Sequence, residues 1–207
     1  MSRRRDRLAG HDTSEGRKEA DEMRITEREL EDELEAFGSE RVEAVANLAH
    51  EGEPDGIGPS LLLALGSRET NLRNIVGDQG HGRGWLQIDD RFHGPWLDAH
   101  AGCDSGSWEA KHKSAGAAGH VPTLTASTVK AIDMLRDNMA FGRSHGIAES
   151  QLVRFAVAAY NAGAGGALAG ARAGNVDAKT THGDYSADVL DRQKAVSRWL
   201  QRNKLPV

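Results

Sequence analysis

The sequence has one cysteine among 207 residues, and this shortage excludes an intrachain disulfide. So low a thiol content is typical of a protein from a reducing compartment and argues against a small disulfide-stapled scaffold. The single thiol, Cys103, stands between Gly102 and Asp104 without a supporting catalytic context. We therefore interpret it as a bystander rather than a nucleophile.

The chain also lacks a long apolar run. No stretch approaches the roughly 18 apolar residues that a membrane-spanning helix needs, so we expect no membrane insertion. Several arginines stand among residues 1–10, but no apolar stretch follows them as it would in a signal peptide. No export signal is therefore visible in the sequence.

An excess of positive charge is missing as well. Residues 1–50 carry nine Lys and Arg against fourteen Asp and Glu, which leaves seventeen of each kind in residues 51–207. The body of the chain thus has no overall basic field of the kind that nucleic-acid binding requires. With apolar residues at 38% and a mean hydropathy of -0.56, the composition is that of a soluble globular protein.

Metal and cofactor motifs are absent too. The histidines are spread over loops without a ligand pair of recognisable spacing, so we expect no metal site; those considered are His81, His93, His100, His112 and His120. The glycines at 80, 82 and 84 match neither the dinucleotide nor the phosphate-loop pattern, and they precede an expected strand rather than a helix. We expect no cofactor.

The chain divides into residues 1–24, expected to be a disordered charged extension, and a domain at 25–207. A capping box at Thr26–Glu29 predicts a helix that ends at Gly38, and Val42, Val45 and Ala49 repeat at helical spacing. Ser60 is expected to cap an apolar helix over 61–69. Further features are a turn at 53–56, a loop at 101–122 and helices starting near 125, 149 and 186.

Residues 71–95 differ from these helical segments. They are rich in Gly and Asp and contain one short apolar run, Trp85–Ile88, which predicts a small hairpin. On the helix from 125 we expect Val129, Ile132, Leu135 and Met139 to face inward. The fold class is therefore mainly α, an α+β architecture with a helical domain and a small β-hairpin lobe beside a cleft.

Glu69 is the first candidate for chemistry. Leu62 and Leu65 precede it by seven and four residues, so all three share one helix face, and the carboxyl group lies at the end of a buried stripe. Burial there disfavours the anion and raises the pKa of the carboxyl. A glycosidase needs such a proton for its leaving oxygen, although an exposed Glu that merely ends the helix fits the same pattern.

Asp78 and Asp89 are the second candidates. They flank the glycine-rich segment 80–84, whose glycines permit tight turns and the close approach of a ligand. If the segment folds as a hairpin, both carboxylates can face a cleft opposite Glu69. Two carboxyl groups on opposite sides of a sugar bond are the minimum for inverting hydrolysis. The alternative is that both Asp residues merely form turns.

Several motifs, in order, resemble the goose-type lysozyme family over about residues 40–202. The catalytic region is represented by Ser67-Arg68-Glu69, Gly77-Asp78, Gly82-Arg83-Gly84 and Gln87-Ile88-Asp89. Ala159-Tyr160-Asn161-Ala162-Gly163-Ala164-Gly165 and Thr180-Thr181-His182-Gly183-Asp184-Tyr185 are similar to two later family segments. The absence of disulfides is like that of the bacterial and phage forms. His81 and Trp85 depart from many relatives, and Trp85 would enlarge the core under the hairpin.

The resemblance implies a peptidoglycan muramidase that cleaves between N-acetylmuramic acid and N-acetylglucosamine. It implies Glu69 as the general acid and Asp78 and Asp89 as the residues that hold and activate water. It also implies a sugar groove lined by His93, Tyr160 and Asn161, with Tyr185 supporting the site near Glu69. A structural role is the alternative for both Tyr160 and His93.

Two other functions fit the same fold. A lytic transglycosylase would form a 1,6-anhydro product without water, and a wall-binding or virion structural module would keep the fold without catalysis. Retention of three carboxyl groups argues against the second. We expect a monomer whose partner is the glycan strand of peptidoglycan. Without a visible export signal, it would reach the wall by holin-type release, virion delivery or another non-classical route.

Overall fold

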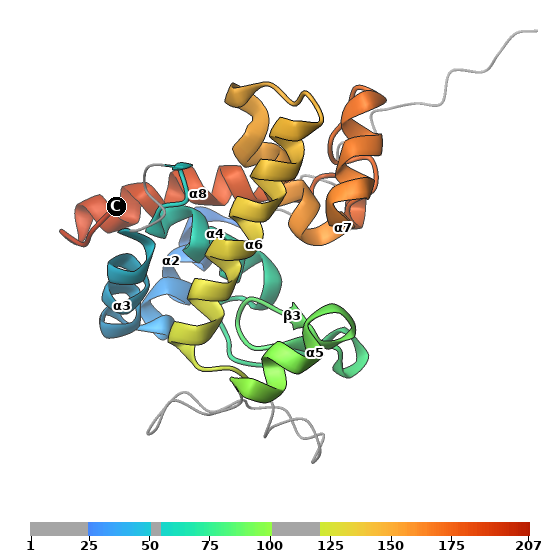
Figure 1. Ribbon diagram of the computed structural model, residues 1–207. Helices are drawn as coiled ribbons and strands as arrows, with labels where there is room; N and C mark the ends of the chain where they lie inside the picture. The colour runs from blue at the N-terminus through green and yellow to red at the C-terminus, as the bar shows by residue number, and fades with distance from the viewer. Residues whose placement is uncertain (1–24, 51–54, 101–120) are drawn as a thin grey trace, which may run out of the picture.

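The computed structural model describes residues 25–50, 55–100 and 121–207, and this part of the chain forms seven α-helices and one small sheet (Figure 1). This confirms the mainly α, α+β lysozyme-like fold class. Four expectations fall wholly or partly outside the described residues: the extension at 1–24, the turn at 53–56, the loop at 101–122 and the role of Cys103.

In the described part of the chain, the helix after the capping box begins and ends as the sequence predicts. Helix α2 (Glu27–Phe37) has the capping box, in which Thr26 accepts from the Glu29 amide and the Glu29 carboxylate accepts from the Thr26 amide. Gly38, with φ of 91°, ends α2 and precedes α3 (Ser39–Ala49). Val42, Val45 and Ala49 are all buried in the core.

Helix α4 (Pro59–Thr70) begins earlier than expected. Ser60 is not its cap: Gly58 holds that position, and Pro59 opens the helix, where its missing N–H leaves no bond unmade. Ser60 is instead buried inside the first turn, 6% exposed. Every residue from 59 to 67 is buried, which makes α4 the central helix of the domain.

The sheet is smaller than the apolar run suggested. It consists of β1 (Val76–Gly77), β2 (Gly82–Arg83) and β3 (Ile88–Asp89), paired antiparallel in that order. Only Ile88 of the run Trp85–Ile88 is in a strand. Trp85 turns into the core, fully buried, with its ring 5.5 Å from that of Phe37. Its departure from the family pattern is therefore a packing feature, as expected.

The remaining helices are α5 (Asp90–Ala99), α6 (Leu124–Ser144), α7 (Leu152–Arg172) and α8 (Tyr185–Arg202). On α6 the stripe expectation is wrong at Val129, which is 44% exposed, whereas Ile132, Leu135 and Met139 are buried. Helix α7 begins close to the expected residue 149 and bends at Gly163, whose φ is 71°. Short 3-10 turns precede α7 (Glu149–Gln151) and α8 (Thr181–Gly183).

The packing of these helices defines where a site can form. Helix α8 packs along α4, and α6 packs against both α3 and α7. In Figure 1 the lobe with β3 and α5 lies at the lower right, below α7. The central helix α4 thus ends between the helical body and the small lobe, because Thr70 donates a hydrogen bond to the carbonyl of Trp85 (2.9 Å).

Candidate active site

Glu69 occupies the last turn of α4. Leu65 and Leu62, one and two turns earlier, are fully buried, as the shared helix face requires. The helix then ends with Asn71 in the left-handed conformation, φ 54°. The buried face of α4 therefore places the Glu69 carboxyl group at the edge of the core.

The surroundings of Glu69 favour its protonated form. Burial raises the pKa of this carboxyl to about 7, although a hydrogen bond from the Tyr185 hydroxyl and the charge of Arg68 both act to lower it. Burial also raises the pKa of the Tyr185 hydroxyl well above its usual value. Tyr185 thus stays a hydrogen-bond donor and Glu69 carries a proton for part of the time near neutral pH.

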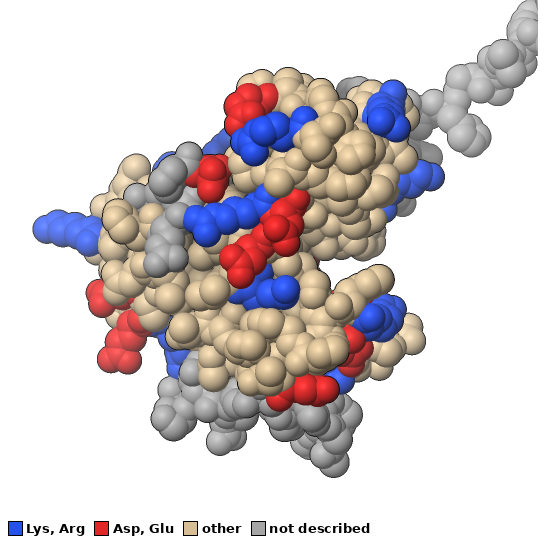
Figure 2. Space-filling model, viewed as in Figure 1, with Lys and Arg blue, Asp and Glu red and all other residues tan. Residues whose placement is uncertain are grey.

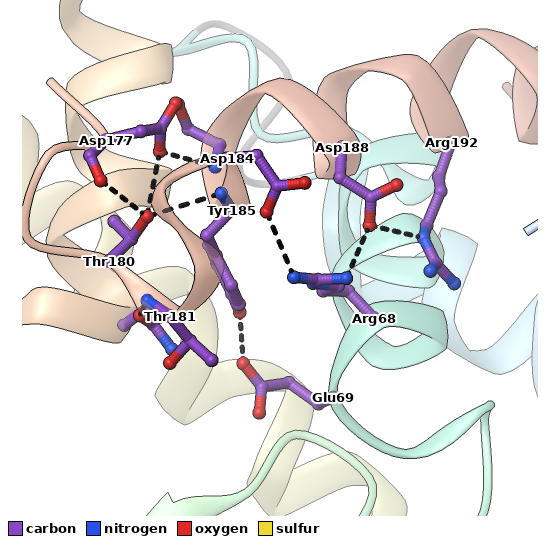
Figure 3. Close-up of polar contacts among 11 residues, drawn as sticks. Arg68, Glu69, Asp177, Thr180, Thr181, Asp184, Tyr185, Asp188 and Arg192 are labelled. Atoms are coloured by element: carbon purple, nitrogen blue, oxygen red, sulfur yellow. Dashed lines mark hydrogen bonds and ion pairs between the residues drawn. The ribbon is translucent and has the colours of Figure 1, made fainter. Parts of the chain in front are cut away.

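Tyr185 is held in place by Asp177, a buried carboxylate in the turn that precedes α8 (Figure 3). Asp177, 1% exposed, accepts hydrogen bonds from the Ser186 amide (2.8 Å) and the Ser186 hydroxyl (2.6 Å). Thr180 accepts from the Tyr185 amide (3.3 Å) and donates to the Asp177 carbonyl (2.9 Å). This anion at a helix N-terminus satisfies free backbone donors and fixes where the Tyr185 ring can lie.

Asp78 and Asp89 meet through a third residue, Arg91. The guanidinium of Arg91 donates to Asp78 Oδ2 (2.6 Å) and forms two hydrogen bonds to Asp89 through its Nε. Asp89 also caps α5 by accepting from the Arg91 amide (2.8 Å). The Arg91 hydrogen bonds hold the pKa of the Asp89 carboxyl below its usual value. The two candidate carboxylates therefore form one charged cluster.

Gln87 braces the hairpin that carries these carboxylates. Its side-chain amide donates to the carbonyls of Gly84 (2.7 Å) and Ile75 (3.2 Å). A Cβ added at Gly82 would lie 2.2 Å from the Gln87 side-chain oxygen. The Gln87 side chain thus packs directly against the backbone at Gly82.

A groove of about 470 Å³ separates the small lobe from α6 and α7. Figure 2 shows this region as a hollow at the right of the molecule. The side chains that line it from the small lobe and from α7 include Asp89, Arg91, His93, Tyr160 and Asn161. Glu69 and Asp78 are not part of this lining. Asp78 connects to it through Arg91, and Glu69 lies close enough to Tyr160 for its charge to raise the Tyr160 pKa.

Two of the groove residues already form hydrogen bonds within the protein. Tyr160 donates its hydroxyl hydrogen to the Leu86 carbonyl (2.8 Å), which ties α7 to the hairpin. Asn161 uses its carbonyl oxygen to accept from the Thr181 amide (2.8 Å), so its NH₂ group is the part left for a ligand. Burial and the nearby charge of Lys130 lower the pKa of His93, which therefore stays neutral at pH 7.

The sequence did not reveal the structural roles of Arg91, Gln87 and Asp177. Arg91 stands two residues after Asp89, where it could have been suspected as a counter-ion, but its reach to Asp78 depends on how the hairpin folds. Asp177 lies in no motif, and its role follows only from the turn before α8. Tyr185 was expected near Glu69, and its hydroxyl contacts that carboxyl directly.

Other site classes find no support in the described part of the chain. No group of three or more His, Cys, Asp and Glu side chains is placed there to hold a metal ion. No described helix combines the length and apolar content needed to cross a bilayer.

Fold and site together define a lysozyme-like domain: a helical body, a small antiparallel lobe, a groove between them and a partly buried carboxylic acid beside it. No family model matches the chain. The chain is similar to lysozyme G of Dromaius novaehollandiae and to lysozyme g of Struthio camelus, each 30% identical over 141 residues. Both matches cover 66% of this chain and 57% of the relative.

Lysozyme g of Gallus gallus is also 30% identical, over 146 residues that make up 68% of this chain and 57% of that protein. The chain thus spans a little more than half the length of these curated relatives. On this similarity and the fold, the chain resembles the goose-type lysozymes.

Proposed function

We propose that the protein is a muramidase that hydrolyses the β-1,4 bond between N-acetylmuramic acid and N-acetylglucosamine, with inversion at the sugar carbon. The observation that carries this proposal is the raised pKa of Glu69, about 7, beside a groove lined by Asp89, a carboxyl group whose pKa is lowered. The names of the relatives support the same activity, although they describe proteins of which this chain covers 57%.

Glu69 supplies the acid in this mechanism. A carboxyl group with a pKa of about 7 is half protonated at neutral pH, so it can give its proton to the departing glycosidic oxygen. After the transfer, the Tyr185 hydroxyl stabilises the carboxylate that remains. A protein that only bound cell walls would gain nothing from holding this proton.

Asp78 and Asp89 act on the attacking water. Arg91 keeps Asp89 ionised, and an anionic carboxylate can orient a water molecule and accept its proton while the sugar carbon is attacked from the opposite face. Because Asp89 lines the groove and Asp78 lies behind Arg91, Asp89 is the nearer of the two to a bound glycan. Asp78 then helps to hold Arg91 and with it the hydrogen-bonding geometry of Asp89.

The groove supports a sugar polymer as substrate. Phe92 is 78% exposed at its rim, and an exposed aromatic ring can pack on the apolar face of a pyranose. The NH₂ group of Asn161 can donate to an acetamido oxygen, and neutral His93 can donate or accept. We propose that the protein works as a monomer on peptidoglycan strands at the cell wall.

Digestion of purified cell walls tests the proposal. We expect the optical density of the suspension to fall and the products to end in reducing N-acetylmuramic acid that carries one added water, detected by mass spectrometry. A dominant 1,6-anhydro product would assign the protein to the lytic transglycosylases. Failure to release any fragment, with folding verified by circular dichroism, would leave a wall-binding or structural module.

A further inference from the structure

Arg68 poses a problem for a protonated Glu69. The two residues are neighbours in the last turn of α4, and the arginine charge favours the Glu69 carboxylate. A guanidinium is always charged and forms a two-point hydrogen-bonded pair with a carboxylate whenever the geometry permits. A direct pair between Arg68 and Glu69 would therefore remove the proton that the proposed general acid needs.

We infer that Asp184 and Asp188 are positioning residues that hold the Arg68 guanidinium toward α8 and so keep it from pairing with Glu69. Arg68 Nη2 lies 3.3 Å from Asp184 Oδ1, and Arg68 Nη1 lies 3.2 Å from Asp188 Oδ2. Figure 3 shows the guanidinium directed at these two carboxylates, while the Glu69 side chain runs to the Tyr185 hydroxyl. This inference rests on the proposed role of Glu69.

The holding carboxylates are themselves fixed. Asp188 also accepts from Arg192 Nε (2.9 Å), and the side chains of Asp188 and Arg192 are only 4% and 8% exposed. Arg192 in turn donates to the Ser67 hydroxyl (2.8 Å), which lies next to Arg68 on α4. Arg68 of α4 is thus joined to two aspartates and a second arginine of α8, and breaking a buried pair of this kind by removing one partner is costly.

The N-terminal end of α8 carries both the hydrogen-bond donor to Glu69 and the two carboxylates that hold Arg68. Tyr185 is its first residue, Asp184 immediately precedes it, and Asp188 lies almost one turn later on a neighbouring face. The Arg68 guanidinium carbon lies 5.6 Å from the centre of the Tyr185 ring, and the hydroxyl of that ring bonds to Glu69. The turn anchored by Asp177 therefore places the Glu69 hydrogen-bond donor and the Arg68 partners together.

Loss of either holding carboxylate would free hydrogen-bonding capacity on Arg68 beside Glu69. The ionisable groups that act on Glu69 from the described elements are Arg68 of α4, Tyr160 of α7 and Tyr185 of α8, and Arg68 alone among them is a cation. An arginine paired with a carboxyl group lowers the pKa of that group by about 1–3 units. If the pKa of Glu69 fell from about 7 by one pH unit, the protonated fraction of Glu69 at pH 7 would fall about fivefold.

Carbon NMR of the glutamate side-chain carboxyl groups tests this without relying on catalysis. The pH titration of Glu69, assigned by comparison with Glu69→Gln, is followed in the wild type, Asp184→Asn and Asp188→Asn. We expect the Glu69 midpoint to fall by at least about one pH unit in Asp188→Asn. Asp191→Asn, which removes the same charge from the exposed Lys194 pair on α8, should leave it unchanged.

A double-mutant cycle with Arg68→Gln separates holding from a simple loss of negative charge. If the carboxylates act by holding Arg68, Asp188→Asn lowers the midpoint only when Arg68 is present. The same lowering in the Arg68→Gln background, or no lowering at all, overturns the inference. If Asp188→Asn does not fold, Asp184→Asn replaces it in the cycle, because the Asp184 side chain is 23% exposed and its loss disturbs the core less.

The two proposals can fail separately. A wild-type protein that releases nothing from cell walls would contradict the muramidase function, while the titration would still decide whether Asp184 and Asp188 control Arg68. If the enzyme is active and the titration behaves as expected, the alkaline limb of its pH profile should shift to lower pH in Asp188→Asn by the same amount. An unshifted limb would contradict the inference.

Discussion

The two sides of the site are built in opposite ways. On the side of α4 and α8, Glu69 lies at the edge of the core, and the charges behind it belong to buried side chains such as Asp188 and Arg192. On the side of the small lobe, Asp78 and Arg91 are 55% and 50% exposed, and each follows a strand of only two residues. Positive φ angles at Asp78 and Gln87 show how irregular that backbone is.

This difference follows from what each side has to do. A carboxylic acid keeps its proton near pH 7 only where burial disfavours its anion, so it must be placed by the core. A group that orients water must stay ionised and reach solvent, which an exposed carboxylate paired with arginine does. In the proposed mechanism, the helical body therefore positions the acid, and the small lobe positions the carboxylates that orient the water.

The largest expected effect is on the acid side. Glu69→Gln keeps the size of the side chain and removes the proton donor, so wall hydrolysis should fall by about 10²–10⁴-fold. The turbidity assay measures this, and the melting temperature should not fall, because a neutral amide replaces a buried titratable group. Activity within tenfold of the wild type would remove Glu69 from its assigned role.

Substitutions on the water side should have a smaller effect. Asp78→Asn and Asp89→Asn should each lower the rate roughly tenfold, a part of the range for general base catalysis, because one carboxylate remains next to Arg91. The double variant should be slower than either. If each single change leaves the rate as it was, the two carboxylates are structural groups of the hairpin.

These two sides also differ in how well the sequence predicts them. The position of Glu69, and the rise of its pKa, follow from Leu62 and Leu65 on one helix face, because helical periodicity is a local property. The bridge from Arg91 to Asp78 spans thirteen residues of a chain whose conformation depends on Gln87 and on glycines. Likewise, Ser60 has the side chain of a helix cap, but Pro59 is the first helical residue and Gly58 is the cap.

Glycine substitutions compare the two sides through stability. A Cβ at Gly66 of α4 would lie 2.3 Å from the buried Trp85 ring, and overpacking of this kind costs about 1–3 kcal/mol. Gly66→Ala should therefore lower the melting temperature by about 2–10 °C. Gly82→Ala displaces the Gln87 side chain instead and should lower activity more than stability. If calorimetry and rate measurements instead showed that Gly82→Ala mainly lowers stability and Gly66→Ala mainly lowers activity, the proposed difference between the two sides would be contradicted.

The smallest effect is expected from removal of residues 1–24. The sequence there contains almost no apolar side chains that could join the core. A chain that begins at Ile25 should keep its melting temperature and its rate of wall hydrolysis. A marked loss of either would mean that the extension packs against the domain and belongs to the site.

The central claim is that burial keeps Glu69 protonated until about pH 7, and the pH dependence of kcat/KM on purified walls tests it most directly. Because the folded-state pKa is raised above the ordinary value of 4.5, protonation favours the folded state, and this contribution is lost as pH rises toward 7. Activity should follow the protonated form and decline on the alkaline side with a midpoint near pH 7. A decline centred near pH 4.5 would show that Glu69 is an ordinary exposed carboxyl group and would contradict the account.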